Sequence, residues 1–355
     1  MSKTWRLEQA RRRYQNTMDI CDVDLAAVLG PLDATPYAMI IPAFAFEPGP
    51  LTQWSLAQVE GYRRIIPWNI LSLYKYSDFA EADISLFIAL SDSVYPHFEE
   101  TLSACNFPAE RILKFQQHPT IRAWHNKLIP MFDLANGISP ALQGEYPLGI
   151  LHADASALVM PSKQGEKLQT WKKLAEEWNV TTQEFVLHLP PLMNRASCGS
   201  TLLAGIKRMN TELGKTTDSI WAGLSRISGI PVKTIKQDWE EMWKKDRYYD
   251  MLGMTFGISR KRLIDKEFRQ HITELCALLE VDEGAFGFYF YERQLTAEQV
   301  YTHEIIGGLE RYRDIYTLSN PCYMWGIPGT LDWEDKQIWE HYYRSLRHDA
   351  PLHKP

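Results

Sequence analysis

The chain has 355 residues, 45% of them hydrophobic and 23% charged, with a formal net charge of −6. This composition excludes an intrinsically disordered protein and leaves room for one large domain with an insertion, or for two domains. No apolar run approaches the ~18 residues that cross a bilayer, and the N-terminus lacks a signal-peptide core. The sequence therefore predicts a cytoplasmic protein with no membrane partner. The five cysteines show no CxxC or CxH spacing, which argues against a structural zinc site.

Short apolar runs alternate with helical segments through the first 160 residues. The predicted strands are Ala38–Phe46, Ile70–Tyr74, Ile84–Leu90, Arg111–Phe115 and Leu148–Leu151. The predicted helices are Ser55–Ile66, Pro96–Ser103 and Thr120–Leu134. This alternation indicates βαβ units and an α/β fold, with a mainly parallel sheet and helices on both faces. There is no GxGxxG after the first strand and no GxxxxGK[ST], which argues against a dinucleotide-binding Rossmann fold and a P-loop enzyme.

A pair of metal-capable side chains follows the last of these strands. The apolar run Leu148–Leu151 ends in His152-Ala-Asp154, and a second apolar run, Ala157–Met160, comes next. Open α/β sheets bind ligands outside the carboxyl ends of their strands. A carboxylate and an imidazole together suit Mn²⁺ or a later transition metal better than Mg²⁺. The alternative is a strand end with a surface histidine and an ordinary aspartate turn.

This turn resembles the DxD turn of GT-A-fold glycosyltransferases, usually Leu-Asp-Ala-Asp between two apolar strands. His152 stands here in place of the first acid. The resemblance implies a GT-A-like, Rossmann-type sheet. It also implies a nucleotide-sugar donor, a UDP-sugar first of all, and a divalent cation, Mn²⁺ or Mg²⁺, held by His152 and Asp154.

The same resemblance assigns roles to residues that precede the turn. Carried over by position, it implies that Ala43 and Phe44 border the nucleotide base and that Asp92 contacts base or ribose. Asn126 and Lys127 would be the helix pair that precedes the metal strand. A capping acid and a solvated helix lysine are the alternative interpretations of Asp92 and Lys127.

The middle of the chain is basic, unlike the rest. Between Pro161 and Gln270 there are 19 Lys+Arg against 13 Asp+Glu, although the whole chain is acidic. Such asymmetry is typical of a polyanion-binding module inside an acidic protein, and a solvated helical surface would produce it too.

Two stretches of this segment fit a helix-turn-helix template. In Ser225–Lys236 a small residue is followed four positions later by Gly229, which permits the positive φ of the turn. Gly253–Ile264 repeats the pattern, and Ala175–Phe185 and Cys276–Phe286 are weaker copies. The predicted DNA-binding residues on the two second helices are Lys233, Lys236, Arg260, Lys261 and Arg262. A helical layer with a solvated basic face is the alternative.

The C-terminal part contains an aromatic run, Phe286–Tyr291, that predicts a strand returning to the sheet. Residues 161–285 would then be a basic helical insertion between a nucleotide-sugar-binding module at 1–160 and a part at 286–355 that completes it. Helices are expected over Thr296–Tyr316 and Asp332–Leu346.

The combination resembles phage-type enzymes that glycosylate hydroxymethylpyrimidines in DNA. It implies sugar transfer from the nucleotide sugar to the hydroxyl of a modified base flipped out of the DNA stack. Glu292 and Glu304 are the candidates for the catalytic general base. Two alternatives stay open: a glycosyltransferase with a protein, lipid or glycan acceptor, and a non-enzymatic DNA-binding protein.

Overall fold

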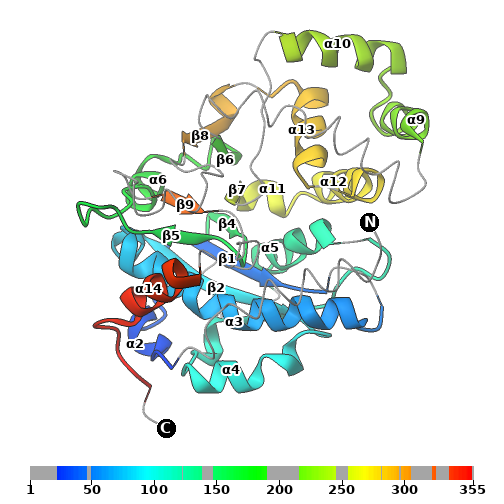
Figure 1. The fold of residues 1–355 in the computed structure, drawn as a ribbon. Helices are drawn as coiled ribbons and strands as arrows, with labels where there is room; N and C mark the ends of the chain where they lie inside the picture. The colour runs from blue at the N-terminus through cyan, green and yellow to red at the C-terminus, as the bar shows by residue number, and fades with distance from the viewer. Residues whose placement is uncertain are drawn as a thin grey trace.

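The computed structural model describes residues 22–45, 49–121, 123–137, 147–189, 216–244, 255–280, 282–295, 297–304, 322–324 and 336–353. Within these ranges seven strands form one sheet in the order β3-β2-β1-β4-β7-β6-β8 (Figure 1). The strands are β1 (Tyr37–Ala43), β2 (Ile84–Ser91), β3 (Ile112–Phe115), β4 (Gly149–Ala153), β6 (Phe185–Leu189), β7 (Thr255–Ser259) and β8 (Val300–Glu304). Strand β7 runs antiparallel to both of its neighbours, β4 and β6. The pairings between the other strands are parallel.

Helices cover both faces of this sheet because its strands are apolar on both sides. On one side, Met39 and Ile41 of β1 belong to a core shared with α2 (Leu25–Leu29), α3 (Gln53–Tyr76), α4 (Glu99–Ala104), α6 (Trp171–Glu177) and α14 (Lys336–Arg347). On the other side, Ala38 and Ile40 belong to a core shared with α5 (Leu128–Ala135), α9 (Thr217–Ser228), α10 (Val232–Lys244), α11 (Arg260–Leu263), α12 (Lys266–Leu279) and α13 (Asp282–Arg293). In this second core α9 packs on α12, and α10 packs on α9. The predicted fold class, a mainly parallel α/β sheet with helices on both faces, is confirmed.

Short elements complete the described chain. A second, two-stranded sheet pairs β5 (Leu158–Met160) with β9 (Cys322–Met324). Single 3-10 turns occur at η1 (Phe79–Glu81), η2 (Tyr95–His97), η3 (Ala109–Arg111), η4 (Ala123–Lys127) and η6 (Ala297–Gln299). Among the residues described, no helix combines the length and the apolar character needed to cross a membrane.

Two predicted strands are helices. The run Ile70–Tyr74 belongs to the second half of α3, which continues through Pro67, and Phe286–Tyr291 lies inside α13. In both cases the segment is buried on nearly all sides: α3 lies between the sheet and α14, where the Trp68 and Tyr343 ring centroids are 5.0 Å apart. A short apolar run does not distinguish a buried strand from a fully buried helix, and here the helix forms.

Only part of the helix-turn-helix prediction holds. Ser225–Lys236 does form two helices, α9 and α10, joined at Gly229 in the left-handed conformation with φ +73°. The second template, Gly253–Ile264, is wrong, because Thr255–Ser259 forms strand β7 in the middle of the sheet. Of the weaker copies, Ala175–Phe185 runs from α6 into β6, whereas Cys276–Phe286 is a true helical turn between α12 and α13.

The basic segment therefore belongs partly to the sheet. Strands β6 and β7 both lie within the predicted insertion at 161–285, and each pairs with strands outside it or with the other. Within the predicted helix Thr296–Tyr316, the described residues form η6 and strand β8, and residues 305–316 lie outside the described ranges. The predicted C-terminal helix is present as α14.

Segments far apart in sequence meet near the two ends of the described chain. Val23 forms an antiparallel bridge with Leu352. The Asp24 amide donates to the Pro351 carbonyl at 2.7 Å, and the His353 amide donates to the Asp22 carbonyl at 2.8 Å. The start and the end of the described chain thus form one small antiparallel junction beside α2.

Candidate active site

Most of the predicted site residues lie at one edge of the sheet. The parallel strands β1, β2, β3, β4, β6 and β8 end there, and β7 begins there, since Ala153 is paired with Thr255. We call this the carboxyl edge. It is the edge at which open α/β sheets bind ligands.

Three ionisable side chains are buried together where β4 reaches this edge. Lys127 Nζ lies 2.8 Å from Asp154 Oδ1, and His152 Nε2 lies 3.0 Å from the same oxygen. The side chains of Lys127, Asp154 and His152 are 3%, 17% and 0% exposed. We call these three residues the edge cluster. The structure thus brings together the two predicted metal ligands and one residue of the predicted Asn-Lys pair.

Each member of the cluster is placed by a different part of the fold. His152 lies inside β4 rather than after it, and its ring stacks on Phe256 of β7 with centroids 4.8 Å apart. Lys127 ends η4, the 3-10 turn that leads directly into α5. Asp154 is the first residue after β4 and begins a tight turn, in which the Ala157 amide donates to its carbonyl at 3.0 Å. Helix, strand and turn meet at a single carboxylate oxygen.

Charge rather than burial sets the protonation state of Asp154. Burial by itself raises the pKa of a carboxyl group because it penalises the charged form. The Lys127 ammonium and the His152 hydrogen bond oppose that effect, and they hold the pKa of Asp154 below its ordinary value. Asp154 is therefore a carboxylate at neutral pH, and His152 Nε2–H donates a hydrogen bond to it.

Helix α3 holds the turn that carries Asp154. Asn69 is buried in α3, and its Nδ2 donates to the carbonyls of Asp154 at 3.0 Å and Ala155 at 3.2 Å. One turn later, Ser72 Oγ accepts from the Val159 amide at 3.1 Å. Sequence reasoning missed both residues. A signal was present in Asn69, an amide side chain within an otherwise apolar helical run from Trp68 to Ile70.

Asn126, the other residue of the predicted pair, has a structural partner. Its Oδ1 accepts from the His118 amide at 2.9 Å, which ties the loop after β3 to η4. The Asn126 side chain is fully buried, and its Nδ2 has no hydrogen-bond partner among the described residues. Asn126 therefore fixes the position of η4, and through it that of Lys127.

The predicted nucleotide-base residues lie at the same edge, at the ends of β1 and β2. Ala43 and Phe44 are both buried, and they pack into the cores on opposite faces of the sheet. Next to them, Gln117 accepts from the Ala45 amide at 3.2 Å and donates to the Ala45 carbonyl at 2.6 Å. Asp92 is exposed directly after β2. These residues lie along the same edge of the sheet as the edge cluster, and Asp92 is the one among them with an exposed polar side chain.

The two candidates for the general base lie in different places. Glu292 is 5% exposed on α13, where its Oε1 pairs with His271 Nε2 of α12. The chain leaves α13 to begin β8 at the edge opposite to the edge cluster, where the Glu184 amide donates to the Gln299 carbonyl at 2.8 Å. Glu304 is the last residue of β8 and is paired with Leu189, so its backbone lies at the carboxyl edge.

The predicted DNA-binding residues fall into two groups. Lys233 and Lys236 are exposed on α10, and Lys236 Nζ lies 3.6 Å from Asp218 of α9. Arg260, Lys261 and Arg262 form the single turn α11 at the end of β7, at the edge opposite to the edge cluster. Arg260 Nε donates to the Ala135 carbonyl at 3.0 Å. Helix α11 is thus no exposed recognition helix.

Arg262 in particular is engaged inside the protein. Its Nε donates to Glu184 Oε2 at 3.0 Å, and its Nη1 donates to Asp265 Oδ2 at 2.9 Å. These carboxylates keep the pKa of Arg262 above its ordinary value, against the lowering effect of burial. The geometry assigns Arg262 to holding α11 against the start of β6.

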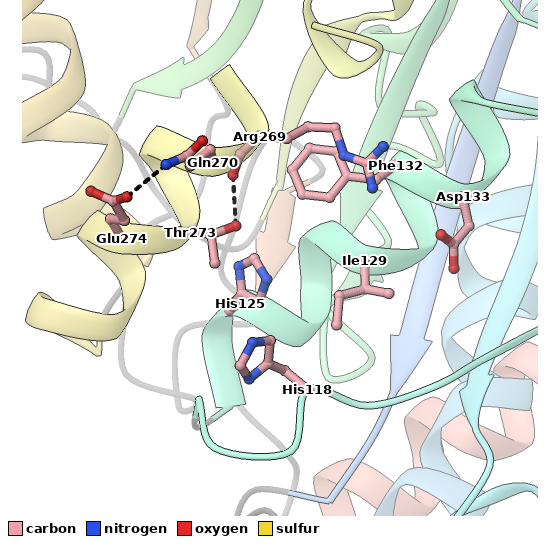
Figure 2. Close-up of a pocket in the computed structure, with 9 residues that line it drawn as sticks. All are labelled: His118, His125, Ile129, Phe132, Asp133, Arg269, Gln270, Thr273 and Glu274. Atoms are coloured by element: carbon pink, nitrogen blue, oxygen red, sulfur yellow. Dashed lines mark hydrogen bonds between the residues drawn. The ribbon is translucent and has the colours of Figure 1, made fainter. Parts of the chain in front are cut away.

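A groove of about 340 Å³ lies on the outer side of η4, between α5 and α12 (Figure 2). His118 and His125 point into it from the loop and from η4, with ring centroids 5.5 Å apart. Arg269 of α12 stacks on Phe132 of α5 at 4.9 Å. Burial, followed by the nearby His118 and Arg269, lowers the pKa of His125 to about 4. At neutral pH both imidazoles are therefore neutral, and the groove is also lined by Arg269 and by the carboxyl side chains of Asp133 and Glu274.

The donor set does not fit the divalent cation that the resemblance implies. Both Lys127 and His152 direct a proton toward Asp154 Oδ1, the oxygen that a cation would need. An ammonium group in contact with that oxygen repels a second positive charge. The described part of the chain contains no group of three or more His, Cys, Asp or Glu residues suited to a metal ion. The edge cluster is a buried ion pair with a histidine donor, and not an open coordination site.

Comparison with known proteins adds little to this geometry. No protein-family model matches the chain, and no curated protein matches it. Among solved structures, the mannosyltransferase Ktr4p from S. cerevisiae is 8% identical with a TM-score of 0.37, over 85% of this chain and 79% of that one. Mouse xyloside xylosyltransferase 1 in its apo form is 9% identical with a TM-score of 0.35, over 77% of this chain and 85% of that one. At TM-scores this low the likeness carries no argument.

Proposed function

We propose that this protein is a glycosyltransferase and that the carboxyl edge of its sheet binds a nucleotide-sugar donor. The observation that carries the proposal is the edge cluster: Lys127, His152 and Asp154 buried in mutual contact at the exit of a parallel strand. Ionisable groups that perturb one another at a ligand-binding edge are typical of functional sites. The sequence around this turn supports the donor class, because it resembles the diphosphate-binding turn of GT-A enzymes.

The cluster suits the chemistry of a nucleoside diphosphate leaving group. Negative charge develops on the diphosphate as the bond to the sugar breaks, and fixed donors stabilise it most when they need no rearrangement. Lys127 supplies a positive charge at this point, and Asp154 keeps the ammonium and the His152 ring in place. Asn69 of α3 holds the turn itself. In this proposal Lys127 contacts the donor, and Asp154 and Asn69 are positioning residues.

The acceptor hydroxyl must lose a proton to a nearby base. We propose Glu304 for this role, because β8 ends at the carboxyl edge. Glu292 is the weaker candidate, since it is buried against His271 on a helix that leads to the opposite edge.

Modified DNA is the first acceptor to test, because α9 and α10 form the predicted helix-turn-helix and expose Lys233 and Lys236. Arg260 and Arg262 give this acceptor no support, because both are engaged with the protein itself. A protein, lipid or glycan acceptor would need nothing from the hairpin.

The test is donor binding followed by transfer. Calorimetry with a panel of UDP- and GDP-sugars, without acceptor, should show binding to at least one donor. Labelled donor is then incubated with plain DNA, hydroxymethylated DNA and a set of glycan acceptors. Asp154→Asn, which keeps the size of the side chain, should lower the turnover with the acceptor that works, and Asp22→Asn, far along the chain, is the matched control. Failure of every donor in the panel to bind would refute the proposed function.

A further inference from the structure

We infer that the donor diphosphate is bound without a divalent cation, and that the Lys127 ammonium occupies the place of the metal. This inference rests on the proposed function. It starts from the contact between Lys127 Nζ and Asp154 Oδ1 at 2.8 Å, in the turn where the resemblance implies a metal.

Coulomb interactions at the edge cluster favour a diphosphate over a cation. A carboxylate in contact with an ammonium is already neutralised, so a divalent ion would gain little from Asp154 and would be repelled by Lys127. His152 adds a proton donor rather than a lone pair on this side, because Nε2 faces the carboxylate at 3.0 Å. A diphosphate brings negative charge instead, and the Lys127 ammonium attracts it.

Hydrogen-bonding capacity leads to the same ligand. An ammonium group donates up to three hydrogen bonds in different directions, so it can bridge a carboxylate and a phosphate oxygen. Asp154 is the most exposed member of the cluster, so a ligand reaches the ion pair from its side. Two fixed contacts, Asn69 with the turn and Asn126 with the His118 amide, hold the two ends of the pair. The ammonium is therefore held in one position before the donor arrives.

The first experiment measures binding, not turnover. Wild-type protein stripped with a chelator is titrated with Mn²⁺ alone, and no binding is expected. Titration with the nucleotide sugar identified above should give the same Kd in excess chelator and in millimolar Mn²⁺ or Mg²⁺. Donor binding that disappears in chelator and returns with Mn²⁺ would overturn the inference and leave the proposed function standing. The absence of donor binding in both conditions would refute the proposed function itself.

The second experiment exchanges the lysine. Lys127→Met keeps the length of the side chain and removes its charge, so donor affinity should fall roughly 10- to 100-fold, the loss of one charge-assisted hydrogen bond. The same variant removes the ammonium that repels a cation at Asp154, and Mn²⁺ binding should appear where the wild type shows none. Lys127→Arg keeps the charge and should retain metal-free donor binding.

Lys173→Met is the matched control, since Lys173 is an exposed lysine of α6 that lies 3.9 Å from Glu177. This variant should bind donor as the wild type does. Where Lys127→Met fails to fold by circular dichroism, the chelator comparison on the wild type and on Lys127→Arg decides alone. Donor affinity in Lys127→Met equal to that of the wild type in chelator would also overturn the inference.

Discussion

Buried ionisable side chains of this protein depend on partners within the protein, because water does not reach them. Lys127 and His152 are almost fully buried, and the Asp154 carboxylate contacts both. Breaking a buried ion pair by removing one partner commonly costs about 3–5 kcal/mol, because the other charge stays behind. Changes at Asp154, including the isosteric Asp154→Asn, therefore affect stability as well as the proposed function, so the folding of each variant is checked by circular dichroism before its turnover is compared.

Burial of His125 predicts an acid-sensitive fold. The folded protein takes up a proton on His125 only near pH 4, whereas the ordinary pKa is 6.5. The unfolded chain therefore binds this proton first as the pH falls. The contribution of the neutral His125 ring to the unfolding free energy is fully present above about pH 6.5, and it is lost as the pH decreases toward 4. Between pH 7 and pH 4.5 this residue should account for a loss of about 2–3 kcal/mol.

Urea unfolding at both pH values measures this loss. His125→Phe keeps an aromatic ring beside Phe132, and its unfolding free energy should fall by correspondingly less over the same interval. His97→Gln, at an exposed histidine of η2, should behave as the wild type does. Equal pH dependence in the wild type and in His125→Phe would contradict the assignment.

At the scale of helices and strands, sequence patterns gave correct predictions where interactions between neighbouring residues decide the structure. Ser225–Lys236 forms its helical turn because Gly229 adopts the positive φ by itself. The same pattern in Gly253–Ile264 fails because Thr255–Ser259 is paired on both sides within the sheet, and that pairing overrides the local preference. The strands Ile84–Leu90 and Arg111–Phe115 were predicted almost to the residue, as buried runs between polar turns.

Two neighbouring basic residues of α11 should behave differently when they are replaced. Arg262→Ala should lower the unfolding free energy by roughly 1–3 kcal/mol, because it leaves Glu184 and Asp265 without their shared partner. Lys261→Ala, at the exposed neighbour, should change it by less than about 0.5 kcal/mol. Denaturant unfolding of both variants measures these effects.

DNA affinity should depend on the helical hairpin formed by α9 and α10. If the protein binds DNA, the double variant Lys233→Ala with Lys236→Ala should weaken binding and reduce the log–log salt slope by roughly 0.9 for each phosphate that the variant no longer neutralises. Arg262→Ala, compared at a temperature where it is folded, should bind as the wild type does. A salt slope changed by Arg262→Ala and not by the lysine pair would reverse this assignment.

At the scale of the whole molecule, the candidate site depends on contacts that no local pattern reports. Both the His152-Ala-Asp154 segment at the end of β4 and the Asn126-Lys127 pair could be recognised in the sequence. Their contact is tertiary, as is the role of Asn69, which lies 85 positions before Asp154. The sheet could be predicted because burial imposes a pattern on each strand. The antiparallel direction of strand β7 could not be predicted, because it depends on which strands, β4 and β6, lie on either side of it in the sheet.

Lys75 is one of the side chains that attach helix α14 to this core, and its loss should be measurable. Lys75 of α3 donates to the carbonyls of Ser345 at 2.6 Å and Leu346 at 3.2 Å, at the end of α14. Lys75→Met should lower the unfolding free energy by roughly 1.5–3 kcal/mol, the contribution of hydrogen bonds from a charged donor. Thermal unfolding followed by circular dichroism measures it, with Lys173→Met as the control. A melting temperature unchanged by Lys75→Met would show that the lysine adds nothing measurable to the packing and the other hydrogen bonds of α14.

The junction between residues 22–24 and 351–353 has a consequence for the order of events on the ribosome. Val23 and α2 are synthesised early, but the backbone partner of Val23, Leu352, is among the last described residues to be made. Strand β5 likewise waits for β9, which lies more than 150 positions further along the chain. The nascent chain must therefore carry the backbone edge at Val23 unpaired until Leu352 has been made, and the edge of β5 unpaired until β9 has been made. Unpaired edges are where growing chains associate wrongly, so chaperone demand should fall once these two partners have emerged.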